Sequence, residues 1–257
     1  MSLTLHAVRG LPDVAAGDDI GALLMSALKA EGMAFRPGDI LVVAHKVMSK
    51  AEGRLVAYAD VTPSAEAADL AAKVRKDPRK VEVILRESRR VIRAVDRKGL
   101  DEGILITEHK LGFISANACV DESNIAEAEA ALLLPADPDA SARGLRQTLE
   151  KASGAAPVGV VVSDTFGRPW RVGQVNVAIG LAGIPAAPHL GGSRDAFGRP
   201  LRVTQPAFAD ELCAAAGLLM EKGGKCPIIL FRGLDWTPTG ETSALELLRP
   251  EKEDLFR

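Results

Sequence analysis

The centre of the chain carries the stretch Ser163-Asp164-Thr165-Phe166-Gly167-Arg168-Pro169-Trp170-Arg171-Val172-Gly173-Gln174, directly after the apolar run 157–162. The β-branched residues of that run predict a buried strand, which presents a carboxylate and two hydroxyls where it ends. Two glycines and a proline in the stretch are incompatible with a regular helix, so we expect a loop there. Oxygen ligands beside its two arginines suit hydrated Mg²⁺ or Mn²⁺ with phosphates. A surface turn with a capping aspartate would use the same residues, and that alternative stays open.

The composition is that of an ordinary globular chain, with 257 residues, 47% apolar and 26% charged. We expect a single domain over residues 1–257, with two interleaved subdomains as the alternative. The net charge of -2 gives no overall attraction to nucleic acid or an anionic membrane, so neither is expected as a partner. No apolar run approaches the roughly 20 residues of a membrane span. The 3 cysteines lack any C-x-x-C spacing, which favours a reducing compartment and predicts a cytoplasmic protein.

Apolar periodicity predicts the other elements of the chain. Strands are expected at 40–44 and 227–231, and a hairpin is expected from the strands 103–107 and 113–115. Helices are expected near 20–28, 62–76, 81–88, 139–153 and 207–220. Asp18 or Asp19 is predicted to cap the first of these helices, and Asp137 is predicted to be a capping residue as well.

Polar residues also follow two other predicted strands. His45-Lys46-Val47-Met48-Ser49-Lys50 comes directly after the strand at 40–44, and lysines with a serine suit a phosphate site. Solvated lysines at a strand end are the more common arrangement. The run 116–124 follows the hairpin and contains Asp121. If the strands before Asp121 and Asp164 are neighbours in one sheet, their carboxylates can share a metal ion; otherwise they are two unrelated caps.

Several common sites are excluded because their motifs are absent. The sequence has no G-x-x-x-x-G-K-[ST] for a P-loop, no G-x-G-x-x-G after a strand, no H-E-x-x-H and no G-x-S-x-G. A set of oxygen-bearing side chains remains: Asp121, Asn124, Asp164 and Thr165. Lys50 and several arginines are the candidates for binding anions beside it. This set suits phosphoryl chemistry with a divalent metal ion.

The chain resembles the coenzyme F420-0:L-glutamate ligase family, the GTP-dependent γ-glutamyl ligases. Matching segments run from about residue 10 to Gly233, in the order of the family. They are Gly10-Leu11-Pro12, Gly17-Asp18-Asp19, Ser49-Lys50-Ala51-Glu52-Gly53-Arg54, Ala116-Asn117-Ala118 with Val120-Asp121 and Ser123-Asn124, Leu134-Pro135, Asp137-Pro138-Asp139-Ala140-Ser141-Ala142, Ser163 to Arg171 with Gly173-Gln174, and Ala209-Asp210-Glu211-Leu212. So many segments in order are more specific than any one motif.

The resemblance implies a fold and a set of roles. The fold would be an unusual mixed α+β one, with mixed sheets and flanking helices, assembled as an intertwined homodimer. GTP would contact Leu11, Pro12, Asp13, Val14, His45, Lys50 and Asn124. Two Mg²⁺ or Mn²⁺ ions would be held, with Asp121 and Asp164 at the first ion and Thr165 at the second. Gln205 lies in a segment that approaches the nucleotide phosphates and a metal in the family, so it is expected at both.

The resemblance also implies the reaction, with Asp121, Asp164 and Thr165 as its catalytic residues. The GTP γ-phosphoryl group would pass to the side-chain carboxylate of F420-0 and form an acyl phosphate. The amine of L-glutamate would then attack this carbonyl and give an amide, GDP and phosphate. The flavin-binding nitroreductase domain fused to some relatives is expected to be absent, because the chain ends at Arg257.

Four positions depart from the family pattern, and one of them is His45, which is not the usual small or amide side chain. Cys119 stands where glycine is usual, Asn176 where aspartate is frequent, and Gln205 where glutamate is frequent. Loss of two carboxylates would change the charge of the pocket, so a diverged acid–amino acid ligase with another acceptor or nucleotide is an alternative. A nucleotide- or F420-binding protein without turnover is a second alternative. The aspartates and Thr165 together favour an enzyme, because a binding protein has little need for them.

Overall fold

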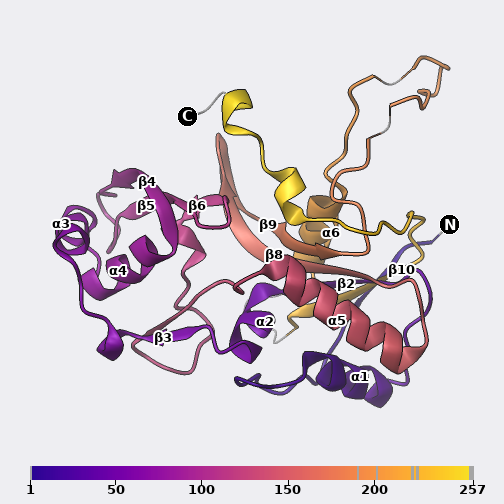
Figure 1. Cartoon of the computed structure of the whole chain (residues 1–257), viewed down its shortest axis with the longest axis horizontal. Coiled ribbons are helices and arrows are strands. Elements are labelled where there is room, and N and C mark those ends of the chain that lie inside the picture. Colours follow the sequence, from indigo (N-terminus) through magenta and orange to yellow (C-terminus); the bar gives the residue numbers. More distant parts are fainter. Residues whose placement is uncertain (1, 190, 201, 221–222, 224–225, 255–257) are drawn as a thin grey trace.

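The computed structural model describes residues 2–189, 191–200, 202–220, 223 and 226–254. It has the predicted mixed α+β architecture, with three sheets and flanking helices (Figure 1). We name two parts of it. The first lobe is built on a five-stranded sheet, and the second lobe, residues 55–133, is built on a two-stranded and a three-stranded sheet.

The five-stranded sheet of the first lobe has the strand order β1-β10-β2-β8-β9. Its strands are β1 (Thr4–Ala7), β2 (Ile40–Ala44), β8 (Gly159–Arg168), β9 (Arg171–Ala182) and β10 (Ile228–Arg232). All neighbours are antiparallel except β2 and β8, which run parallel with Ala44 opposite Ser163. Figure 1 shows α5 (Pro138–Ser153) in front of this sheet and α6 (Phe208–Gly217) behind it. Because both faces are covered, β2 and the first half of β8 read as continuous apolar runs.

Two short helices complete the first lobe. They are α1 (Ile20–Ala30) and α2 (His45–Ala51), and α2 begins at the residue that follows β2. The Asp19 side chain accepts a hydrogen bond from the N–H of Ala22 and caps α1, as predicted. Asp137 caps α5 in the same way through Ala140, and Leu145 and Leu149 of α5 are buried, as the sequence predicted.

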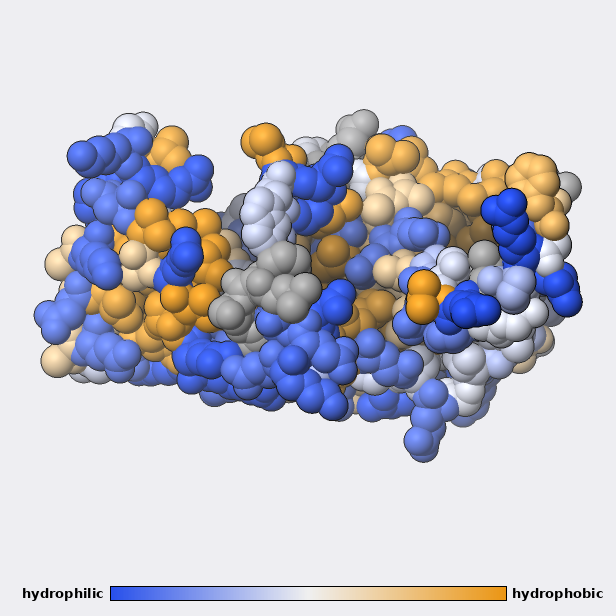
Figure 2. Space-filling model, turned by 90° about the horizontal axis from the view of Figure 1, so that it is seen from above, coloured by the Kyte–Doolittle hydropathy of each residue, from blue (hydrophilic) through white to orange (hydrophobic). Residues whose placement is uncertain are grey.

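The second lobe has its own, smaller core. It contains the sheet β4-β5-β6 and the pair β3-β7, with two helices against them; the elements are β3 (Leu55–Ala57), α3 (Ala65–Val74), α4 (Pro78–Arg86), β4 (Ser88–Val95), β5 (Ile104–His109), β6 (Ile114–Ala116) and β7 (Ala130–Leu132). Figure 2 shows apolar residues gathered on the surface of this lobe. On β4 and β5 the apolar side chains of Ile92, Ile104 and Ile106 are half-buried. Phe113 packs edge-on against Phe166 of β8 and joins the two lobes.

The expected loop at 163–174 is wrong. β8 continues through Arg168 and β9 begins at Arg171, so the stretch is a long hairpin with Pro169 and Trp170 at its tip. Gly173 takes a positive φ of 88° inside β9, which glycine adopts readily, and the proline lies in the turn, where its missing N–H costs no ladder hydrogen bond. Trp170 has a positive φ of 58°, which closes this tight turn.

Several arginines follow residue 85, at the end of α4 and on the strand after it. A helix is present at α4, but it is separate from α3, because Asp77 caps a new helix with Pro78 at its first position. Arg89, Arg90 and Arg93 lie on β4 and not at a helix end, and the first two pair with Glu108 of β5. Within the described parts of the chain, no helix is both long and apolar enough to cross a membrane.

Candidate active site

The parallel pairing of β2 and β8 brings the first two candidate residues together. Ala44 lies opposite Ser163, so His45 and Asp164, the next residue of each strand, meet at the same end of the sheet. His45 Nε2 lies 3.3 Å from Asp164 Oδ1. Nδ1 of the same ring contacts Ser49 Oγ at 3.2 Å, whereas the buried Nε2 has no hydrogen bond of good geometry. The ring therefore leaves one polar atom available beside the Asp164 carboxylate.

The second aspartate is reached by the next residue of the same helix. Lys46 Nζ lies 2.7 Å from Asp121 Oδ2 and donates to the carbonyl oxygen and hydroxyl of Ser123 at 2.8 and 2.6 Å. The N–H of Ser123 donates to Asp121 Oδ1 at 2.7 Å. Burial by itself raises the pKa of Asp121, but Lys46 and Ser123 outweigh it and hold the pKa below its usual value. Asp121 is thus a carboxylate anion at neutral pH.

Cys119 lies between the two aspartates. Its thiol contacts Ser115 Oγ at 2.9 Å and interacts with both Asp164 and Asp121. Burial, and then the charge of Asp164, raises the pKa of this thiol well above its usual value, so it stays protonated. Both aspartates therefore lie near the Cys119 thiol. The strands before them, β6 and β8, belong to different sheets, so the condition under which the sequence predicted a shared metal ion is not met. The contact between lobes, and not a common sheet, brings them together.

The chain just after the predicted nucleotide residues near the N-terminus contacts the same helix. The N–H of Gly17 donates to the carbonyl of Ala51 at the end of α2, close to Lys50. Leu11 and Val14 are half-buried against the first core, while Pro12 and Asp13 are exposed. Asn124 is exposed and has a left-handed φ of 58° just after the Ser123 that Lys46 holds.

The last two predicted residues point elsewhere. Successive residues of a strand face opposite sides, and Thr165 Oγ1 donates to Asn176 Oδ1 of β9 at 3.0 Å, while Asp164 faces α2. The Gln205 amide donates to the carbonyl of Ala187 at 3.0 Å, in the segment before α6. In the described structure neither side chain contacts Asp121 or Asp164. Sequence reasoning also missed Lys46 as a partner of Asp121, although its place beside His45 was a usable signal.

The donor set fits a divalent cation that also binds phosphates. Within the described residues, no three His, Cys, Asp or Glu side chains form a ready-made metal cluster. Magnesium commonly takes only one or two carboxylates from the protein and completes its shell with waters and substrate phosphates. Asp121 and Asp164 supply two such carboxylates, and the unpartnered Nε2 of His45 adds a further polar atom at the site.

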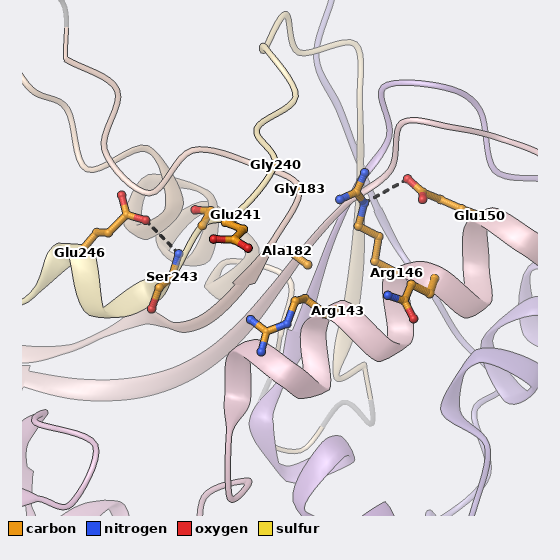
Figure 3. A pocket seen from close by; sticks show the side chains of 11 residues that line it. Arg143, Arg146, Glu150, Ala182, Gly183, Gly240, Glu241, Ser243 and Glu246 are labelled. Atoms are coloured by element: carbon orange, nitrogen blue, oxygen red, sulfur yellow. Dashed lines mark hydrogen bonds and ion pairs between the residues drawn. The ribbon is translucent and has the colours of Figure 1, made fainter.

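A cavity of about 800 Å³ lies elsewhere, between α5 and the segment 240–246 (Figure 3). Arg143 and Arg146 line it from α5, and Glu241 and Glu246 line it from the opposite segment. Arg146 is already paired with Glu150 at 3.0 Å. None of the predicted site residues lines this cavity. The candidate active site therefore remains at Asp164, in the middle of β8 beside the end of β2, and Asp121, which Lys46 of α2 contacts.

The architecture and the site together define a class of protein: a mixed α+β chain with paired carboxylates and basic side chains, without a P-loop or a dinucleotide fingerprint. Comparison with known proteins gives the family. Residues 10–233 match the family described as F420-0:Gamma-glutamyl ligase, and the chain belongs to this family.

Named relatives cover most or all of the chain. The chain is 42% identical over 259 residues to the Coenzyme F420:L-glutamate ligase of Methanothermobacter thermautotrophicus, covering 100% of both chains. It is 42% identical over 245 residues to the protein of that name from Methanopyrus kandleri, covering 94% of this chain and 92% of the relative. The similarly named protein of Methanocaldococcus jannaschii is 41% identical over 221 residues, 86% of this chain and 85% of its own length.

Proposed function

We propose that this protein is a coenzyme F420-0:L-glutamate ligase that uses GTP and a divalent metal ion. The observation that carries the proposal is the meeting of Asp121 and Asp164 around α2, through Lys46 and His45, in a chain that belongs to the family. A free carboxylate is a poor electrophile. The γ-phosphoryl group of GTP therefore passes to the carboxylate of F420-0, and the amine of L-glutamate displaces phosphate from the acyl phosphate to form an amide.

Each group of residues has a task in this reaction. The segment from Leu11 to Val14 and the side chain of Lys50 bind the nucleotide; Gly17, three residues after this segment, donates to the carbonyl of Ala51 at the end of α2, which supports this assignment. Lys46 fixes the Asp121 segment, and His45 orients Asp164. A bound Mg²⁺ or Mn²⁺ ion would be held by both aspartates and would neutralise charge on the phosphoryl group. Thr165 at a second ion, and Asn124 and Gln205 at the nucleotide, are assigned from the family resemblance alone, because Thr165 bonds to Asn176 and Gln205 to Ala187 in this structure.

We also propose that the chain works as a homodimer. Large apolar side chains are strongly exposed on the β8–β9 hairpin, the segment before α6 and the end of α6: Val172 at 100%, Val203 at 89%, Phe197 at 87% and Leu218 at 81%. Apolar groups gathered on projecting segments mark surfaces that a partner covers. A second copy that exchanges the hairpin would bury them. The buried free thiols of Cys119, Cys213 and Cys226 suit the reducing cytoplasm.

The proposal is tested by incubating the purified protein with GTP, Mn²⁺, L-glutamate and F420-0. Glutamylated F420 and an equal amount of GDP are expected, with no product when GTP or metal is omitted. Nucleotide cleavage that requires another acceptor would show a diverged acid–amino acid ligase. The buried Cys119 beside Asp164, at a position where glycine is usual, favours that alternative. Binding of F420-0 or GTP without any cleavage would overturn the proposal in favour of a binding protein.

A further inference from the structure

The Asp121 segment is held from the second lobe as well as from α2. Glu122, the next residue, points away from Lys46 into the second lobe. Tyr58 donates its hydroxyl to Glu122 Oε1 at 2.6 Å, and Lys80 Nζ donates to Glu122 Oε2 at 2.5 Å. The backbone of Asp121 is paired with Leu132 of β7 at 3.1 and 2.8 Å. The Asp121 side chain is therefore bound by the first lobe, and the side chain of the next residue, Glu122, is bound by the second lobe.

The two anchors of Glu122 are built into the second core. Tyr58 is 4% exposed, and the guanidinium of Arg79 stacks on its ring at 5.5 Å. Lys80 is also buried, and its ammonium is shared between Glu122 and Glu102. Burial by itself lowers the pKa of Lys80, but the two carboxylates outweigh it and raise the pKa, so the lysine remains charged. Burial, and then the bond to Glu122, raises the pKa of Tyr58, so its hydroxyl stays a donor.

We infer that Tyr58 and Lys80 are positioning residues, which fix the carboxylate of Asp121 beside Asp164 by anchoring Glu122. Without the anchors of Glu122, only Lys46 and the backbone pair with Leu132 would hold the segment, and the Asp121 side chain would then occupy a wider range of positions. A metal ion needs its ligands in place before it binds, because ordering them afterwards costs affinity. The inference rests on the proposed function, since it assumes that Asp121 binds the metal ion.

Two mild variants separate positioning from stability. Tyr58→Phe removes one hydroxyl and keeps the ring under Arg79, and Glu122→Gln removes the charge pair with Lys80 and keeps an acceptor for Tyr58. Matched controls lie in the same lobe without contact to residues 121–124. Ser88→Ala removes a hydroxyl that bonds the carbonyl of Ile84, and Glu82→Gln removes a carboxylate that pairs with Arg86.

The readout is the dissociation constant of Mn²⁺, measured without nucleotide from the EPR signal of the free ion. We expect both Glu122-anchor variants to raise this constant about tenfold, at the low end of the effect of losing an outer-shell partner. The controls should match the wild type, although the Tm of all four variants falls. The apparent activation constant for Mn²⁺ should rise by the same factor, with kcat at saturating metal little changed.

Asp121→Asn in the same titration distinguishes the two ways to fail. If Asp121→Asn weakens Mn²⁺ binding but Tyr58→Phe and Glu122→Gln bind it like their controls, the positioning role is overturned and the proposed site stands. If Asp121→Asn itself binds Mn²⁺ as tightly as the wild type, the proposed metal site is wrong, and the positioning inference is overturned with it.

Discussion

The two lobes differ in how they hold charged groups. In the first lobe, each buried carboxylate has its own separate partners in an apolar core. Asp39 pairs with Arg232 at 2.6 Å, and Asp139 accepts hydrogen bonds from the N–H groups of Leu181 and Ala244. In the second lobe, charges form a connected network in which Lys80 joins two glutamates. A large sheet is stabilised mainly by apolar burial, whereas a small core gains more from such pairs.

The same contrast is visible in the carboxyl groups. In the second lobe, ion pairs and hydrogen bonds lower the pKa of several carboxyls: Asp77, Glu82, Glu87 and Glu102. In the first lobe, burial raises the pKa of Asp210 despite one backbone hydrogen bond. The candidate site lies where the lobes meet, so it combines an aspartate from each. The first lobe supplies Asp164 with His45 and Lys46 of α2, and the second lobe supplies Asp121 and the anchors of Glu122.

The largest expected effect comes from the aspartate of the first lobe. Asp164→Asn should lower kcat/KM for ligation roughly 1000-fold, because a metal ion contributes several kcal/mol of transition-state stabilisation and each 1.4 kcal/mol is about tenfold. Its Tm should stay near that of the wild type, since asparagine has nearly the same size and shape as aspartate and leaves the packing around it unchanged. The control Asp137→Asn makes the same chemical change at a helix cap that asparagine also satisfies. Near-normal turnover of the Asp164 variant would remove this residue from the site.

Local patterns predicted much of the frame but not the contact that makes the site. The strand at 40–44, the hairpin at 103–115 and the helix at 139–153 follow from periodicity and caps, and all are present. The sequence did not predict the extension of β8 past Asp164, because glycine and proline favour a loop and are equally compatible with a hairpin turn. Such a choice depends on strand pairing between distant residues, which local preference does not determine.

The pairing of the aspartates depends on the tertiary structure. The sequence predicted that Asp121 and Asp164 would meet through neighbouring strands of one sheet, and the structure joins them through α2 and the contact between lobes. The sequence pointed to Lys50, and not to Lys46, as the lysine of the site. This shows the same limit of prediction from local sequence. Both lie on one helix, and only the fold reveals that Lys46 reaches Asp121.

The next largest effect tests whether the lobes unfold together. Leu149→Ala in the first core and Ile84→Ala in the second each remove a fully buried side chain and should cost about 3 kcal/mol. Arg54 joins the lobes by donating to the carbonyl of Leu134 and pairing with Glu87, so we expect one calorimetric transition, lowered roughly 10 °C by either change. Two transitions, of which Ile84→Ala lowers only one, would show separately folding subdomains.

A smaller effect is expected from the lysine at the end of α2. Lys50→Ala should raise the KM for GTP about tenfold with kcat little changed, the scale of one charge-assisted hydrogen bond. The control is Lys29→Ala, which removes an exposed lysine from the last turn of α1. Steady-state kinetics with varied GTP at saturating metal measure both. An unchanged KM would show that the nucleotide does not contact Lys50. Lys46 would then be the lysine of α2 that remains at the site.

The smallest effect concerns the ion pairs of the second lobe and their dependence on pH. Burial by itself raises the pKa of Glu87, but His109, Arg54 and Lys110 outweigh it and lower the pKa from its usual 4.5. A carboxyl whose pKa is lower in the folded state contributes stability above its unfolded pKa and loses it as the pH falls through the folded value. Thermal unfolding should therefore show a Tm that decreases as the pH falls below 4.5. In Glu87→Gln this decrease should be smaller by at most about 4 °C, the change that about 1 kcal/mol produces in a chain of this size.

An Asp210→Asn variant should not reduce the decrease, because burial raises the pKa of Asp210 and its carboxyl favours folding in the protonated form. If both variants follow the wild type over the whole range, the charge network of the second lobe contributes no more to stability than the isolated carboxyls of the first.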